Sequence, residues 1–135
     1  MKNENVEIFQ DKIRLSAVFV EKELDLIHNF TNLLAKLKQG IILKDDIDRH
    51  PDFYITLQNL TGLYLTLETP YKERLKEEEQ NKIEKIILKF KNLEQIEIEE
   101  LIAGVDIVRK MMALTGFHDV MRRTEEADGW ANEPF

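Results

Sequence analysis

The sequence has no cysteine in its 135 residues. Disulfide frameworks, catalytic thiols and zinc sites that need thiolate ligands are therefore excluded. Glycine and proline are also scarce, with five and three residues, while 43% of the residues are apolar and 33% are charged. That balance is typical of a folded protein, and a chain of this length forms one domain with a core but not two.

Long apolar segments are missing as well. No apolar run approaches the ~18 residues that a membrane span requires. The first twenty residues contain three acids, which is unlike a secretory signal peptide. We expect a cytoplasmic protein that does not associate with membranes.

The net charge is −7, and the last twelve residues hold four acids and no base. Because an acidic chain repels phosphate backbones, nucleic acid is not the expected partner. The one basic strip lies on a face of a predicted helix and consists of Arg74, Lys82, Lys85 and Lys89. Glu78 shares that face, which is typical of a solvated helix surface.

Residues 5–39 contain neither glycine nor proline and repeat apolar side chains at helical spacing, until Gly40 supplies a stop signal. One stripe consists of Phe9, Ile13, Ala17, Val20, Leu24, Ile27 and Leu34. A second stripe beside it consists of Ile8, Leu15, Phe19, Leu26 and Leu33. Together they cover about 200° of the helix, whereas a surface helix has an apolar arc of about 100°. This helix needs partners on both flanks.

The segment after the first helix is ambiguous. Residues 41–52 contain Pro51 and concentrate acids, which indicates a connection. Residues 53–67 carry no charge and fit a helix and a β-hairpin equally well. We favour the helix because a lone two-stranded ribbon is marginal in water.

Two more helices follow. Thr69 and Pro70 are a good start for a helix that continues to about Asn92. The last helix starts near Glu97, where acids suit the positive end of the helix dipole, and it ends or kinks at Gly116. The predicted fold is all-α: an antiparallel bundle of about four helices with a long N-terminal helix.

The last predicted helix also carries a second apolar stripe, made of Ile96, Ala103, Ile107 and Leu114. Exposed contiguous apolar surface is normally an interface. The second stripes of the first and last helices are therefore predicted to bind a protein partner or further copies of the chain.

Catalytic and metal-binding patterns are weak. Asp25 and His28, with Glu21 one turn earlier, have the carboxylate-to-histidine spacing of metal-binding helical bundles. They fall on the polar arc of the first helix, and the apolar faces of the other helices offer no matching carboxylates. We predict no catalytic residue, metal or cofactor, and keep a helical-bundle metal protein or enzyme as an alternative.

The chain divides into a helical domain over residues 1–123 and an acidic, aromatic tail over 124–135. The candidate anchors in the tail are Trp130, Glu133, Pro134 and Phe135. An acidic end closing in Pro-Phe resembles the C-terminal tip of bacterial single-stranded-DNA-binding proteins. The resemblance implies an accessory protein whose tail recruits replication or repair partners. Packing of the tail on its own chain or on a partner stays open.

Taken together, these patterns predict a small acidic protein without enzymatic activity. It would act by binding other proteins, as an assembly factor, adaptor or minor subunit of a larger complex. The nucleic-acid accessory protein and the metal protein or enzyme are the alternatives.

Overall fold

The computed structural model describes the backbone of residues 2–67 and 69–131, and the side chains of residues 7, 9–47, 49–67 and 71–124. The described chain is mostly helical and contains no strand. Its elements are α1 (Lys2–Lys38), a 3-10 helix η1 (Lys44–Arg49), α2 (Pro51–Thr66), α3 (Thr69–Lys72), α4 (Glu77–Lys91), α5 (Ile98–Leu114) and α6 (Phe117–Ala131). The predicted all-α class is confirmed.

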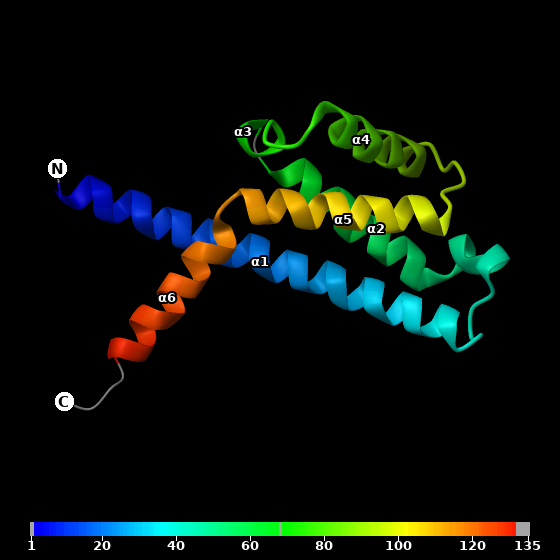
Figure 1. Cartoon of the computed structure of the whole chain (residues 1–135), viewed down its shortest axis with the longest axis horizontal. Helices are drawn as coiled ribbons and strands as arrows, with labels where there is room; N and C mark the ends of the chain where they lie inside the picture. The colour runs from blue at the N-terminus through cyan, green and yellow to red at the C-terminus, as the bar shows by residue number, and fades with distance from the viewer. Residues whose placement is uncertain (1, 68, 132–135) are drawn as a thin grey trace.

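Helix α1 is the longest element and forms one edge of the molecule (Figure 1). It packs mainly against α2 and α6, while α5 packs against both α2 and α4. Figure 1 shows that α1 and α2 run in opposite directions, as do α4 and α5. The N-terminal end of α1 and the far end of α6 both project beyond the other helices.

The core is formed by side chains from every long helix. Its largest fully buried members are Tyr64, Phe53, Phe117, Leu26, Leu33, Leu60, Leu63, Ile83, Leu101, Met111, Met112 and Val105. Two glycines end the helices that border this core, as the sequence predicts. Gly40 follows α1 with a φ of 74°, and Gly116 follows α5 with a φ of 76°, a region that glycine enters without steric cost.

Residues 53–67 belong to helix α2, so the hairpin alternative is wrong. Pro51 occupies the first turn of α2, and the ring Nδ1 of His50 accepts a hydrogen bond from the Asp52 amide at 3.1 Å. The Thr56 hydroxyl donates to the Asp52 carbonyl at 2.7 Å, so this buried side chain needs no strand partner.

The predicted helix from Thr69 to Asn92 is interrupted. Helix α3 ends at Lys72, and α4 begins only at Glu77. The carboxylate of Glu79 accepts from the Lys76 amide at 3.2 Å, as in half of a capping box. Three successive glutamates at this end of α4 favour a new helix N-terminus there. Arg74 consequently lies outside α4.

Helix α6 follows Gly116 and continues to Ala131, beyond residue 123, where the sequence predicts the end of the helical domain. It begins at Phe117, whose ring stacks on that of Phe19 with the centroids 5.8 Å apart. Residues 132–135, and with them Glu133, Pro134 and Phe135, lie outside the described residues, as does the side chain of Trp130. The division into a domain and a tail stays a prediction.

Candidate functional site

The second apolar stripe of α1, which the sequence predicts to bind a partner, is mostly buried within the chain. Leu26 and Leu33 are fully buried, and Phe19 is buried against Phe117. The expectation that this stripe is left for a partner is therefore wrong for these three residues. The reason is that α2 and α6 both cover this side of α1. Of the other two members, Leu15 is exposed and the side chain of Ile8 is outside the described residues.

The second stripe on α5 is also largely internal. Ile96 and Ile107 are buried in the same core, so for them too a partner-binding role is wrong. Ala103 is half-buried beside α4, and only Leu114 at the end of α5 stays exposed. Helix α5 is enclosed because α2 and α4 pack against it from different sides.

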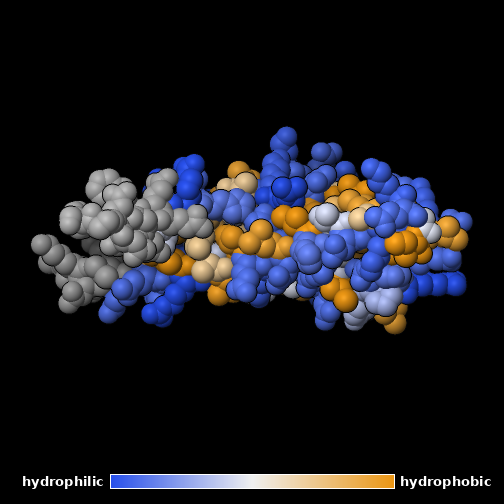
Figure 2. All heavy atoms as spheres, turned by 90° about the horizontal axis from the view of Figure 1, so that it is seen from below, coloured by the Kyte–Doolittle hydropathy of each residue, from blue (hydrophilic) through white to orange (hydrophobic). Residues whose placement is uncertain are grey.

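The other stripe of α1 is partly open, although its Val20 and Leu34 pack against the core. Leu24 is 61% exposed and Phe9 is 56% exposed, while the apolar residues between and beyond them are half-buried. We call this row the α1 seam, and its members are Phe9, Ile13, Ala17, Val20, Leu24 and Ile27. Figure 2 views the molecule from below Figure 1 and shows hydrophobic residues interspersed with hydrophilic ones over the coloured part of this face. The seam is one candidate interaction surface.

A second apolar surface lies between α2 and α4. A groove of about 270 Å³ is lined by Phe53, Tyr54, Leu57, Phe90, Leu93, Glu94, Gln95 and Ile96. The rings of Tyr54 and Phe90 pack against each other at its edge, with centroids 5.4 Å apart. We call this surface the α2–α4 groove. No periodic pattern in the sequence marks this groove, because its residues come from α2, from the end of α4 and from the link between α4 and α5.

Leu93 gives this groove an unusual feature. It follows α4 with a φ of 58°, in the left-handed region. The Leu93 amide donates to the Phe90 carbonyl at 3.3 Å and the Glu94 amide to the Lys89 carbonyl at 2.9 Å, the two bonds of a Schellman motif. Glycine is the usual residue at this position, yet here a leucine occupies it with 88% of its surface exposed.

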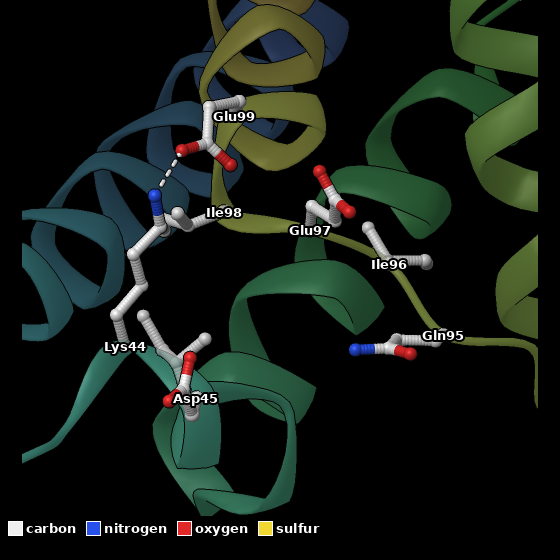
Figure 3. A pocket seen from close by; sticks show the side chains of 8 residues that line it. Lys44, Asp45, Gln95, Ile96, Glu97, Ile98 and Glu99 are labelled. Atoms are coloured by element: carbon white, nitrogen blue, oxygen red, sulfur yellow. Dashed lines mark ion pairs between the residues drawn. The ribbon is translucent and has the colours of Figure 1, made fainter.

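A more polar pocket of about 330 Å³ lies where η1 meets the start of α5 (Figure 3). The Lys44 ammonium lies 2.7 Å from a carboxylate oxygen of Glu99 and joins the two elements. This pairing raises the pKa of Lys44 and lowers the pKa of Glu99. In Figure 3 the carboxylate of Glu97 points away from the pair. Of the charged residues that line this pocket, Lys44 and Glu99 are therefore paired with each other.

Three residues of the predicted basic strip, Lys82, Lys85 and Lys89, lie together on α4 and line one groove with Glu99 and Glu100. Arg74 lies before α4, and its guanidinium donates to the Leu114 carbonyl. The Lys89 ammonium donates to both carboxylate oxygens of Glu100, at 3.0 and 2.9 Å. Lys82 and Lys85 stay exposed on α4. Half of the predicted basic residues thus have partners in the chain.

Glu21, Asp25 and His28 are exposed on α1, as their place on its polar arc predicts. The His28 ring lies 3.4 Å from the Asn32 amide. Within the described residues, no three His, Asp or Glu side chains are grouped so that they could hold a metal ion. None of the described helices is both long and apolar enough to span a membrane.

Comparison of the chain with protein-family models, curated proteins and solved structures gave no match.

Proposed function

We propose that this chain is a protein-binding module without catalytic activity, acting as an assembly factor, adaptor or minor subunit of a larger complex. The observation that carries the proposal is Leu93, an exposed leucine held in a left-handed conformation at the rim of an apolar groove. As part of the same proposal, the module acts in the cytoplasm.

Leu93 costs the isolated chain stability in two ways. A left-handed conformation is less favourable by about 1 kcal/mol for a residue with a Cβ than for glycine. In addition, the leucine gains little burial, since 88% of it is exposed. Both costs are offset if a bound protein covers the side chain, and strained residues of this kind concentrate at functional sites.

The chemistry of the α2–α4 groove indicates what binds there. Six of the eight residues that line it are aromatic or aliphatic, and the other two, Glu94 and Gln95, are polar. Such a groove suits an apolar side chain, or a short row of them, presented by a helix or extended segment of another protein.

The scaffold is part of the proposal. Helices α1, α2, α4 and α5 would form the antiparallel bundle expected from the sequence, and α6 would be an addition to it. The opposite directions of α1 and α2, and of α4 and α5, support this arrangement (Figure 1). No observation favours the nucleic-acid or metal alternatives over protein binding.

Site-specific photo-cross-linking tests the proposed function. A photoreactive amino acid is placed at Leu93 in one variant and at Glu78, an exposed residue of α4, in a control variant. Irradiation in cells should give a discrete adduct with another protein from position 93 and none from position 78. The purified partner should then bind the wild-type chain and bind Leu93→Asp at least tenfold more weakly. Equal labelling from both positions, or no adduct from either, contradicts the proposal.

A further inference from the structure

We propose that the α1 seam binds the α1 seam of a second copy, with the two helices antiparallel. The inference rests on the proposed function, because it names a second copy of the chain as one partner of the binding module. It uses a different surface from the α2–α4 groove, so the two surfaces can succeed or fail separately.

The spacing of the seam indicates that its occupant is a helix. Ile13, Ala17, Val20, Leu24 and Ile27 follow one another at intervals of four and three residues, and Phe9 precedes Ile13 by four. This alternation is the seam of a coiled coil, in which each apolar side chain inserts between residues of a facing helix. A straight row of this length fits a helix better than it fits a loop or a compact ligand.

The order of side-chain sizes in the seam favours an antiparallel pair of identical helices. With the two-fold axis between residues 18 and 19, Ile13 of one copy lies against Leu24 of the other. Ala17 then lies against Val20, on both sides of the axis. The small alanine next to the axis allows the two backbones to approach closely. An isologous arrangement of this kind uses the same patch twice and closes as a dimer.

The charges beside the seam are complementary in the same register. Arg14 and Glu21 flank the seam on its solvent side, seven residues apart, which is too far for them to pair within one helix. In the antiparallel pair, Arg14 of each copy meets Glu21 of the other, so two ion pairs form. The Arg14 side chain is exposed, and its ion-pair contact in the chain is with Asp11 at 3.9 Å. Arg14 is therefore available for Glu21 of the second copy.

The opposite flank of the seam is already occupied by the chain's own α6. There Glu23 is buried and paired with His118. The second copy can therefore approach from the side of Arg14 and Glu21. Figure 1 shows that the N-terminal end of α1 extends beyond α2 and α5, so those helices do not obstruct a second α1 there.

A charge-swap series tests the pairing. Arg14→Glu and Glu21→Arg each place two like-charge pairs across the dimer, and each should weaken dimerisation by about tenfold. The double variant restores opposite charges and should recover the wild-type affinity to within a few-fold. Sedimentation equilibrium gives the dimer constants, and circular dichroism confirms that the helices persist. Recovery in the double variant requires contact between copies, because the two residues do not reach each other within one chain.

A matched pair of leucines tests the seam itself. Leu24→Glu should abolish the dimer, whereas Leu88→Glu on α4, where the leucine is similarly exposed at 58%, should leave it unchanged. A wild-type mass of one chain at high micromolar concentration overturns the proposal, and so does a dimer that Leu24→Glu does not affect. Adducts from position 93 that persist in either case leave the proposed function standing. A dimer that depends on the seam, together with no adducts from position 93, supports the dimer and contradicts the proposed function.

Discussion

His118 on α6 donates a hydrogen bond from Nε2 to a carboxylate oxygen of Glu23 on α1, and the two atoms lie 2.5 Å apart. Glu23 is only 5% exposed. The ring of Phe117, next to His118, stacks on Phe19, one turn before Glu23. One polar contact and one aromatic contact thus hold the start of α6 against α1.

His118→Ala should lower the free energy of unfolding by about 2–4 kcal/mol, because it leaves the buried carboxylate of Glu23 without its partner. Urea unfolding at pH 7, followed by circular dichroism, measures the change. The double variant with Glu23→Leu and His118→Leu replaces the pair by apolar groups and should recover most of the loss. A stability equal to wild type in His118→Ala would show that water satisfies Glu23 equally well.

Leu26→Ala and Leu24→Ala should differ sharply in stability although the two leucines are two residues apart. Leu26 is fully buried, so its truncation should cost about 2–5 kcal/mol through lost burial and the cavity left behind. Leu24 is mostly exposed, and its truncation should change the stability of one chain by about 0.5 kcal/mol or less. Thermal unfolding at low concentration measures both. Equal losses would contradict the observed orientation of α1.

Gly62→Ala and Gly104→Ala should also behave differently, although both glycines lie inside helices. A Cβ at Gly62 meets nothing within 4 Å, so alanine should stabilise α2 by about 0.5–1 kcal/mol. A Cβ at Gly104 would lie 3.1 Å from Ile86 Cδ1 and from Leu60 Cδ1, both in the core. This crowding should cancel the helical gain, and Gly104→Leu should destabilise the fold strongly. Denaturant unfolding ranks the three variants, and a large gain for Gly104→Ala would mean that α4 and α5 pack loosely.

Leu93→Gly should stabilise the isolated chain by about 1 kcal/mol, because glycine adopts the left-handed conformation without strain. Leu93→Ala is the control, since it shortens the side chain but keeps the Cβ and should give no such gain. Differential scanning calorimetry detects the difference as a higher Tm for the glycine variant. The same variant should lose partner binding, so that stability and function change in opposite directions. A lower Tm for Leu93→Gly would show that the leucine contributes to the fold.

Tyr64 should make the fold sensitive to alkaline pH. Burial and the nearby Glu84 carboxylate, which accepts from the Tyr64 hydroxyl at 3.2 Å, raise the pKa of Tyr64 to about 12. The pKa of tyrosine in the unfolded chain is about 10. Protonated Tyr64 therefore contributes its full stabilisation below pH 10, and this stabilisation is lost as the pH rises toward 12. Unfolding free energies measured between pH 8 and pH 11.5 should fall by about 1–2 kcal/mol. Tyr64→Phe should remove most of this fall, and an unchanged slope would contradict the assignment.

Local patterns in the sequence predicted the positions of most helices. Gly40 and Gly116 end helices as expected, and Pro51 starts one. The boundary inside residues 69–92 was missed because the apolar period continues across it. The glutamates after Lys76 are equally compatible with a continuous surface helix. Only the non-helical break between Lys72 and Glu77 in the structure separates the two interpretations.

The orientation of α1 could not be predicted from its own residues. Its buried face contains Ser16 and Glu23, which makes it look less suitable for a core than the seam. The Ser16 hydroxyl donates to the Lys12 carbonyl at 2.6 Å, and Glu23 depends on a histidine 95 residues later. A buried carboxylate can be paired with a residue far away in the sequence only once the chain has folded. The periodic pattern of α1 therefore cannot show that Glu23 will be buried.

Residues of α1 differ in whether folding restricts which amino acids they can be. Changes at Leu26 or Leu33 are limited by whether the chain folds at all. Changes at Leu24 have almost no such limit, so random substitution over generations would soon replace it with a polar residue unless something else selects against the loss. If close homologues retain an aliphatic residue at this position, its retention would reflect natural selection for association, because folding places almost no constraint on it.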